Sequence, residues 1–516
     1  MKLIDYTLLF LFSVVLTASP VQAASDSDYR IVNIPLELSI HMHFSNKYAW
    51  DENWPVAKEY ERLTGIKLVG VVDKVGTNSS DLFLEMLQQR TLPDIIGGVA
   101  QARQFMELGR QGRVIPLNNL IEEHAPNLKA FFDKNPVVRN AITASDGNLY
   151  YIPYVPDGQA GKGYFIRQDW LDKLGLRQPQ TVDELYEVLV AFRDRDPNGN
   201  GIKDEVPLFF RHWEEVLRLL VLWDGRSTGS DTAHQFYIKD GAVRYGYADP
   251  EYRTGIRQIA KWYKERLIDR ELFTRGNKAR EILLGNNRGG LIHDWFSSTS
   301  AFNMSLAENI PGFNLVPIAP PKSISGKRIE EHGRSPVKPD GWAITSDNNY
   351  PVETIKYMDF LFSDKGRNIS NFGVEGETWT MVGGRPRFTD AVLNSKSAVN
   401  SQMWDIGAQI PIGFYQDYSY ERQWTNEIAM KGIQMYLDGG YILDQFPGFV
   451  LNEAEQKIYD QYWPNILSYM LEKQKQWIMG LSDVDKDWNN YMKTIEQMGF
   501  YKVQEALQAS YDRQYK

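Results

Sequence analysis

The chain has 516 residues, which is more than a single hydrophobic core supports, so we expect more than one domain. Its 43% hydrophobic and 24% charged residues are typical of a soluble globular protein. The net charge of −9, with no basic stripe, argues against nucleic-acid binding, although a few buried Arg and Lys residues can still make a local site attractive to an anion.

The first 23 residues have the pattern of a secretory signal peptide. Lys2 supplies a short positive region, Leu8–Ala18 is apolar, and residues 21–23 (VQA) resemble a cleavage site. The apolar run is too short for a stable membrane anchor. The chain contains no cysteine, which excludes a lipid-modified cysteine and any disulfide. We therefore expect a periplasmic protein without a membrane anchor, in monomeric form.

The N-terminal part alternates between strand and helix patterns. Asp51 is placed to cap a helix that has Pro55 in its first turn and ends at Gly65. This β-α-β-α-β order predicts a parallel sheet covered by helices. The predicted elements are strand Leu36–Phe44, the helix from residue 51 to 65, strand Ile66–Val72, helix Ser80–Arg90 and a strand that opens at Asp94.

The second half is richer in helix signals. Tyr150–Pro156 is aromatic and proline-rich, which suits a chain crossing between two lobes. Thr181-Val182-Asp183-Glu184 is a capping box that opens a helix. Further helices are expected to begin at Asp249-Pro250 and at Pro351, and the last 120 or so residues read as mostly helical.

A loop rich in oxygen ligands follows the helix that the capping box opens. A hard cation such as Ca²⁺ takes six to eight oxygen ligands, and a glycine at the sixth position of such a loop permits the sharp turn. Position 12 of the loop, counted from Asp196, is Pro207, where an EF-hand has a glutamate ligand. The adjacent pair Asp204 and Glu205 is expected to replace that glutamate. A metal-free turn is the alternative. The predicted ligands of this structural Ca²⁺ are Asp196, Asn198, Asn200, the Ile202 carbonyl, Asp204 and Glu205.

Several long, irregular segments resemble one known family: residues 35–55 (PLELSIHMHFSNKYAWDENWP), 163–185 (GYFIRQDWLDKLGLRQPQTVDEL), 339–344 (PDGWAI) and 403–426 (MWDIGAQIPIGFYQDYSYERQWTN). They resemble the large extracellular solute-binding proteins of carbohydrate ABC importers, and among these the periplasmic alginate-oligosaccharide-binding proteins. The resemblance covers essentially the whole mature chain. It implies a two-lobe α/β fold, in which each lobe is a helix-flanked, mainly parallel sheet and the ligand cleft lies between the lobes.

The resemblance also implies a function and a division into lobes. The protein is expected to capture acidic oligosaccharides, above all alginate oligosaccharides, and to deliver them to the membrane permease of an ABC importer. Another acidic or neutral oligosaccharide remains the alternative. After the signal peptide (1–23) we expect an N-terminal lobe from residues 24–154 and 311–395, and a C-terminal lobe from residues 155–310, which holds the calcium loop, and 396–516, which is helical.

Trp295 and Trp424 match two residues of the family that stack on sugar rings. Both are expected on the C-terminal lobe, with Lys47 on the N-terminal lobe, so that a bridging ligand favours closure. By the same resemblance, the further residues that line the cleft are Lys47, Tyr154, Arg167, Arg334 and Tyr420.

These residue types suit an acidic sugar. A pyranose has an apolar C–H face and a rim of hydroxyls, and both tryptophans lie among polar residues, in HDWFSST and ERQWTN. Arg can bind a uronate carboxylate bidentately, whereas Lys acts as a point charge. Each aromatic residue could instead belong to a core, and each basic residue could be a solvated surface charge.

A catalytic function is the main alternative. Asp294 beside Trp295, or Glu421 near Trp424, could belong to a glycoside hydrolase with paired carboxylates, and a lyase would need a base and a charge neutraliser. Neither arrangement can be read from spacing. The sequence contains no nucleophile elbow, phosphate-binding loop or zinc motif, and His41, His43 and His293 show no third ligand partner. We therefore expect a binding protein and no enzyme.

Overall fold

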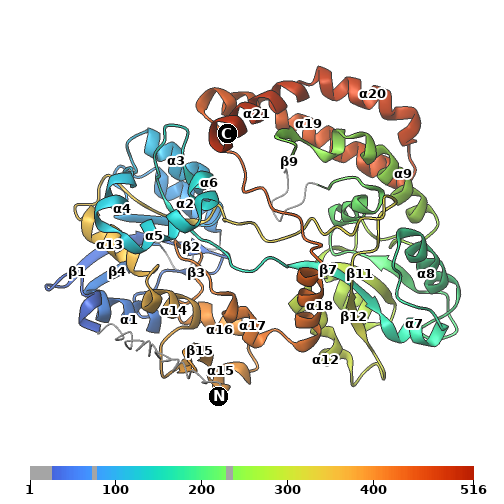
Figure 1. Ribbon diagram of the computed structural model, residues 1–516, viewed down its shortest axis with the longest axis horizontal. Helices are drawn as coiled ribbons and strands as arrows, with labels where there is room; N and C mark the ends of the chain where they lie inside the picture. Colours follow the sequence, from blue (N-terminus) through green and yellow to red (C-terminus); the bar gives the residue numbers. More distant parts are fainter. Residues whose placement is uncertain (1–25, 73–77, 228–235) are drawn as a thin grey trace, which may run out of the picture.

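The computed structural model describes residues 26–72, 78–227 and 236–516, which form two lobes joined in the middle (Figure 1). The expected signal peptide lies outside the described residues. Each lobe is a sheet flanked by helices, so the predicted two-lobe α/β fold is confirmed. The expectation of mainly parallel sheets is wrong, because strands from later passages of the chain pair antiparallel in both sheets. In the described part of the chain, no helix combines the length and the apolar character needed to cross a membrane.

The first lobe contains a five-stranded sheet in the order β4-β1-β5-β13-β6 within the described residues. β1 is parallel to β4 and β5, whereas β13 runs antiparallel to β5 and β6. The antiparallel strand comes from a later passage of the chain through this lobe. The strands are β1 (Leu36–His41), β4 (Ile66–Gly70), β5 (Ile95–Gly98), β6 (Ile152–Pro153) and β13 (Gly341–Ile344).

Helices cover this first sheet on both sides (Figure 1). α1 begins at Pro55, whose missing N–H is not needed at a helix start, and ends at Gly65, which adopts φ 81°. Asp51 does not cap α1: its carboxylate accepts the Asn53 amide at 2.9 Å, in the turn before the helix. The helices are α1 (Pro55–Thr64), α2 (Ser79–Leu87), α3 (Ala102–Arg110), α4 (Asn118–His124), α5 (Pro126–Lys134), α6 (Pro136–Ile142), α13 (Pro351–Phe360), α14 (Asp364–Phe372), α15 (Asp390–Leu393), α16 (Val399–Asp405) and α17 (Tyr418–Trp424).

The second lobe contains a four-stranded sheet in the order β12-β7-β11-β8 within the described residues. β7 runs antiparallel to β11 and β12, while β8 is parallel to β11. The strands are β7 (Lys162–Arg167), β8 (Val206–Phe209), β11 (Gly289–Trp295) and β12 (Leu315–Ile318). Short antiparallel pairs complete the strands of the two lobes: β2 (His43–Phe44) with β3 (Tyr48–Ala49), β9 (Tyr237–Lys239) with β10 (Ala242–Arg244), and β14 (Trp379–Val382) with β15 (Arg385–Phe388).

Buried side chains lie on both faces of the second sheet. Leu291 faces one core and Ile292 the other, because successive strand residues point to opposite faces. The C-terminal helices α19 and α20 pack on α9 as an outer layer (Figure 1). The helices are α7 (Gln168–Leu174), α8 (Val182–Asp194), α9 (Pro250–Lys264), α10 (Ala279–Gly285), α11 (Phe296–Ser300), α12 (Phe302–Leu306), α18 (Glu427–Asp438), α19 (Glu453–Met479), α20 (Val484–Gln497) and α21 (Phe500–Tyr515), and the 3₁₀ helices of the chain are η1 (Asp26–Tyr29), η2 (Trp213–Trp223), η3 (Gly246–Ala248) and η4 (Gly276–Lys278).

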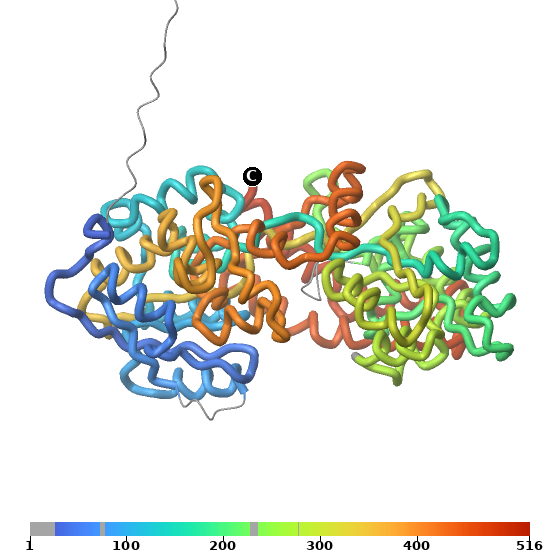
Figure 2. The backbone as a smooth tube through the Cα atoms, turned by 90° about the horizontal axis from the view of Figure 1, so that it is seen from below, coloured from blue at the N-terminus to red at the C-terminus, as the bar shows by residue number. Residues whose placement is uncertain are grey.

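Within the described residues, the chain crosses between the lobes at residues 154–161, 319–340 and 425–426. Figure 2 shows the two lobes side by side with these segments between them. The crossings differ from the expected lobe boundaries in two places. β12 pairs with β7, so residues 315–318 belong to the second lobe. Met403 and Tyr420 lie in the first core, so residues 399–424 belong to the first lobe.

Arg167 is a buried charge at the end of β7. Its side chain is 1% exposed and lies 4.6 Å from the ring of Trp170 and 4.4 Å from the ring of Phe313. The guanidinium donates to the Asp169 carboxylate at 2.8 and 2.6 Å and to Asn287 Oδ1 at 2.6 Å. Arg167 therefore joins β7, α7 and the turn that precedes β11.

We expect Arg167→Met to lower the free energy of unfolding by about 2–3 kcal/mol, because hydrogen bonds to a charged group contribute about 1.5–3 kcal/mol. Urea unfolding followed by tryptophan fluorescence measures the change. Arg139→Met, at an exposed position of α6, is the matched control and should leave the midpoint unchanged. An Arg167→Met protein with the wild-type midpoint would show that the buried guanidinium contributes nothing to folding.

Candidate functional site

Five of the seven predicted sugar contacts meet where the chain crosses between the lobes. A Cβ atom on Gly161 would lie 3.2 Å from Cζ3 of Trp295 and 3.8 Å from Cγ of Arg334, so these side chains flank the same point of the first crossing. The ring of Tyr420 lies 5.9 Å from that of Trp424. We call this set the crossover cluster; it comprises Tyr154, Trp295, Arg334, Tyr420 and Trp424.

The two tryptophans lie on neighbouring segments of different lobes. Trp295 ends β11 and Trp424 ends α17, and the hydroxyls of Ser297 and Thr425, just beyond them, are 3.2 Å apart. Trp424 packs against the first core, because α17 buries Tyr420 there. The expectation that both tryptophans belong to the C-terminal lobe is therefore wrong for Trp424.

Arg334 connects the second crossing to α17. Its Nη2 donates to Glu421 Oε2 at 2.5 Å, and its Nη1 donates to the Asp157 carbonyl at 3.3 Å. The guanidinium also lies 5.6 Å from the centroid of the Tyr418 ring. The ion pair is mostly buried, so a ligand carboxylate in this place competes with Glu421 for the arginine.

The tyrosines of the site are hydrogen-bond donors at neutral pH. Burial raises the pKa of Tyr154, Tyr418 and Tyr420, so their phenols stay protonated. The Tyr418 hydroxyl and the Trp424 Nε1 are buried without a hydrogen-bond partner. A buried donor without an acceptor costs free energy, and a sugar oxygen would supply the acceptor.

Lys47 and Arg167 lie outside the crossover cluster. Lys47 is exposed in the turn between β2 and β3, and its Nζ donates to the Tyr48 hydroxyl at 3.0 Å. Arg167 is bound to Asp169 and packed between two rings at the other end of β7. The structure therefore does not bring these two basic residues to the tryptophans.

Sequence reasoning missed Lys162, whose ammonium lies 4.5 Å from the centroid of the Trp295 ring. Lys162 begins β7 and is the register partner of Trp295 on β11. Sequence reasoning also gave no role to Tyr418 and considered Glu421 only as a catalytic carboxylate. The local signal for Lys162 is its position between two glycines, which allow close approach of side chains to the backbone.

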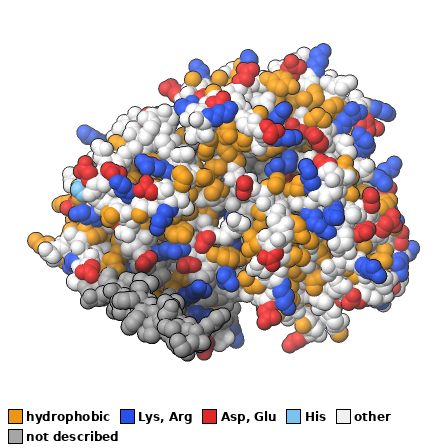
Figure 3. Space-filling view, viewed as in Figure 1, with side chains coloured by type: hydrophobic (Ala, Val, Ile, Leu, Met, Phe, Trp, Pro, Cys, Tyr) orange, Lys and Arg blue, Asp and Glu red, His pale blue; other side chains and the backbone are white. Residues whose placement is uncertain are grey.

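A cavity of about 390 Å³ lies between the lobes beside the second crossing. Its lining includes Arg103 and Tyr151 of the first lobe, Tyr459 of the second lobe, and Lys338 of the crossing itself. Figure 3 shows hydrophobic side chains gathered along the junction of the lobes. None of the seven predicted sugar contacts lines this cavity, although Ser335, the neighbour of Arg334, does.

The predicted calcium loop joins α8 to β8 in the second lobe. Asp196 accepts the amides of Gly199 and Gly201 at 2.9 and 3.0 Å, and these glycines adopt φ 75° and 77°. Asp204 Oδ1 accepts the side-chain amides of Asn198 and Asn200 at 3.2 and 3.1 Å. The Ile202 carbonyl accepts the Asp204 amide at 3.0 Å. Five of the six predicted ligands thus take part in hydrogen bonds within the loop.

Glu205 indicates that these residues fit a cation. Both of its carboxylate oxygens are buried without a hydrogen-bond partner. Burial raises the pKa of the Glu205 carboxyl, and the charges of Asp196 and Asp204 act in the same direction. A buried carboxylate beside two others is costly unless a positive charge joins it. Arg288, whose Nε lies 3.2 Å from Asp204 Oδ2, pairs with Asp204, while the Glu205 oxygens keep no partner.

The calcium loop and Trp295 lie at opposite ends of the same sheet. β8 and β11 are parallel, and the loop precedes Val206 at the start of β8, whereas Trp295 ends β11. A strand rises about 3.3 Å per residue, so roughly 20 Å of β11 separates them. A cation in the loop would therefore be too far from Trp295 to contact a ligand there, and any role that it has would be structural.

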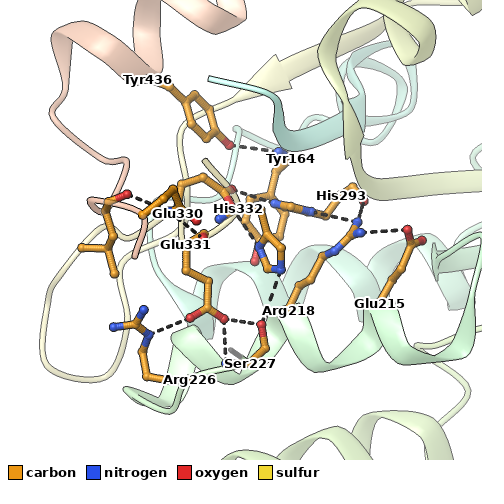
Figure 4. A network of polar contacts seen from close by, with 12 residues as sticks. Tyr164, Glu215, Arg218, Arg226, Ser227, His293, Glu330, Glu331, His332 and Tyr436 are labelled. Atoms are coloured by element: carbon orange, nitrogen blue, oxygen red, sulfur yellow. Dashed lines mark hydrogen bonds and ion pairs between the residues drawn. The ribbon is translucent and has the colours of Figure 1, made fainter. Parts of the chain in front are cut away.

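His293, a metal-ligand candidate from the sequence, belongs to a buried polar network (Figure 4). Its Nε2 is 2.7 Å from Glu330 Oε2, and Glu330 Oε1 is 3.2 Å from His332 Nδ1. These ligand atoms lie within 4.8 Å of one another, which a metal site would allow. However, Arg218 lies 3.4 Å from His293 Nδ1 and donates to its carbonyl at 2.9 Å, and this positive charge opposes a cation. We interpret the group as a hydrogen-bond network that ties the second crossing to β11.

Comparison with known proteins identifies the family of the chain. Residues 53–368 match the bacterial extracellular solute-binding protein family. The fructooligosaccharide ABC transporter substrate-binding protein FusA of Streptococcus pneumoniae serotype 4 (strain ATCC BAA-334 / TIGR4) is 23% identical over 442 residues, which cover 82% of this chain and 80% of FusA. The polygalacturonan/rhamnogalacturonan-binding protein YtcQ of Bacillus subtilis (strain 168) is 34% identical over 158 residues, or 30% of each chain.

Solved structures agree with this match. The crystal structure of alginate-binding protein AlgQ2 without calcium ion has 50% sequence identity and a TM-score of 0.80, and the similarity covers 94% of this chain and 99% of that one. FusA in complex with kestose has 22% identity and a TM-score of 0.71, covering 92% and 99%, and shows the same fold. The family match spans more than half of the chain, so the resemblance expected from the sequence is confirmed: the protein belongs to the bacterial extracellular solute-binding protein family.

Proposed function

We propose that this chain is a periplasmic binding protein that captures acidic oligosaccharides, specifically alginate oligosaccharides, and delivers them to the permease of an ABC importer. The observation that carries the proposal is the 50% identity to an alginate-binding protein over 94% of the chain. This similarity covers so much of the chain that it includes both lobes. The related proteins are named as binding proteins, which favours transport over catalysis.

In this proposal, sugar rings stack on Trp295 and Trp424. The phenols of Tyr154 and Tyr420 donate hydrogen bonds to sugar oxygens, because burial keeps them protonated. Arg334 exchanges part of its contact with Glu421 for a uronate carboxylate, which a guanidinium can bind through two parallel N–H groups.

Ligand binding is linked to the angle between the lobes. Trp424 packs on the first lobe and Trp295 belongs to the second, so a sugar that touches both rings makes more contacts when the lobes close. Such a difference in contacts shifts the population toward the closed form. The closed form then presents surfaces of both lobes to the permease.

Calcium would bind through Asp196, Asn198, Asn200, the Ile202 carbonyl, Asp204 and Glu205. Oxygen ligands of this kind suit Ca²⁺, and the ion would neutralise the carboxylates that the loop gathers. The name of the alginate-binding relative mentions calcium, and that of a FusA structure mentions an EF-hand mutant, which supports an ion in this fold. A bound calcium ion would stabilise the connection from α8 to β8.

We expect alginate oligosaccharides to raise the melting temperature of the mature protein, because a ligand that binds only the native state stabilises it by RT ln(1 + [L]/Kd). Neutral gluco- or manno-oligosaccharides of equal length should raise it less.

Calorimetry should show that Trp295→Ala and Trp424→Ala each weaken binding of alginate oligosaccharides by about 1–3 kcal/mol. Trp488→Ala, on the outer helix α20, is the control.

Equal stabilisation by neutral sugars would assign the protein to another ligand within the same importer family. The bound oligosaccharide should be recovered intact after long incubation. New chain ends in the recovered sugar would contradict a pure binding function and indicate a lyase or hydrolase.

We expect a calcium chelator to lower the melting temperature of the wild-type protein, and added Ca²⁺ to restore it. The double variant Asp204→Asn with Glu205→Gln should respond to neither, because it lacks two anionic ligands. Glu187→Gln, at an exposed position of α8, should behave as wild type. If chelation leaves the wild-type melting temperature unchanged, the loop is a turn without a structural ion.

A further inference from the structure

The cavity between the lobes begins at the carboxyl end of β5 in the first sheet. β1 lies between β4 and β5, so the chain leaves β1 toward one side of the sheet and returns on the other side. Ligands of α/β proteins commonly bind outside the carboxyl ends of the strands at such a point. The segment that follows β5 lines the cavity through Ala100, Ala102 and Arg103. The cavity therefore occupies a place where folds of this kind bind ligands.

The crossover cluster lies at the same edge of that sheet. β6 is antiparallel to β13 and β13 is antiparallel to β5, so β6 runs parallel to β5, and its carboxyl end leads into Tyr154. Asp340, which precedes β13, joins the two places: its carboxylate accepts the Ala100 amide at 2.8 Å, and its carbonyl accepts the Tyr154 amide at 2.8 Å. Ser335, the neighbour of Arg334, also lines the cavity. The cavity therefore begins next to the crossover cluster.

The lining of the cavity suits a pyranose ring. Most of its side chains are apolar and a few polar groups stand among them, as in small-molecule sites generally. Tyr459 of α19 is half-buried, and its ring lies 6.0 Å from that of Trp463, one turn later, which holds it in place. Burial raises the pKa of Tyr459 to about 12, so its phenol stays a hydrogen-bond donor at neutral pH. Tyr459 thus offers an aromatic ring to the C–H face of a sugar and a donor to its hydroxyls.

Arg103 connects the two lobes beside this cavity. Its Nη2 donates to Asp460 Oδ2 at 2.7 Å, so α3 of the first lobe is paired with α19 of the second. The two side chains are 61% and 48% exposed, and such an ion pair contributes little to stability, so the guanidinium can turn toward a ligand at small cost. Because Asp460 balances its charge, Arg103 offers N–H groups to a ligand rather than a net positive charge.

We infer that the cavity is a further sugar subsite, in which a distal ring of the oligosaccharide stacks on Tyr459 and its oxygens accept hydrogen bonds from Arg103. This inference rests on the proposed function and deepens it: the preferred ligand is an oligosaccharide long enough to reach from Trp295 and Trp424 into the cavity. A disaccharide occupies the crossover cluster alone. A longer chain touches both lobes a second time, at α3 and α19, and therefore favours the closed form further.

The test compares two mannuronate oligosaccharides that differ only in length, a disaccharide and a hexasaccharide. Calorimetry on the mature protein should show that the wild type binds the hexasaccharide about tenfold or more tighter than the disaccharide. Tyr459→Ala and Arg103→Met should each weaken hexasaccharide binding by about fivefold or more, and change disaccharide binding by less than about twofold. Tyr459→Phe, which keeps the ring, should retain most of the affinity for the hexasaccharide.

Two variants at positions that do not line the cavity are the controls. Arg253→Met removes another exposed ion pair, in which Arg253 Nε lies 2.6 Å from Asp485 Oδ1. Tyr501→Ala removes an exposed ring of α21. Both variants should bind each oligosaccharide as the wild type does.

The outcomes separate this inference from the proposed function. If the wild-type protein binds neither oligosaccharide, the proposed function fails and this inference fails with it. If the wild type binds both equally well, or if both variants keep its preference for the longer ligand while folded, the proposed function stands and the cavity is no subsite. An equal loss of affinity for both ligands also overturns the inference, because Tyr459 and Arg103 would then act on the angle between the lobes. Should Tyr459→Ala not fold, Arg103→Met decides.

Discussion

Each lobe of this protein is built from separate parts of the chain, and backbone pairs tie the crossing segments to one another and to the lobes. Ala160 pairs with Gly333 across the first two crossings, while Val155 pairs with Tyr415 of the first lobe and Glu330 with Ile442 of the second. The site depends on the same segments, since Tyr154 begins the first crossing, Arg334 lies in the second and Trp424 precedes the third. Bending at the junction would therefore move the proposed ligand contacts, which is how the proposed function links ligand affinity to the angle between the lobes.

Local signals in the sequence predicted those elements whose causes are local. Pro55 and Gly65 delimit α1, and the Thr181 hydroxyl accepts the Glu184 amide at the start of α8, as the capping pattern indicates. The lobe boundaries could not be predicted in this way. β12 belongs to the second lobe because it pairs with β7, and this pairing joins segments about 150 residues apart. No periodicity within residues 311–318 records that partner.

The candidate site could likewise be predicted only in part from local sequence signals. Polar surroundings marked Trp295 and Trp424 as candidates, and the structure brings them to one junction. The charged contacts could not be chosen by residue type, because an arginine is equally suited to a ligand carboxylate and to an internal one. Arg167 is occupied by Asp169. Lys162, an ordinary basic residue at a strand start, becomes notable only through the register that places it opposite Trp295.

The second sheet separates two tasks along one pair of strands. At the start of β8, the calcium loop gathers carboxylates that need a cation. At the end of β11, the buried Asp294 carboxylate beside Trp295 is paired with Arg211 and Arg280. Roughly 20 Å of strand lies between the two ends, so an ion in the loop would act on the residues around Trp295 only through the sheet that connects them. An ion in the loop would then stabilise the sheet that carries Trp295 without itself touching the proposed sugar site.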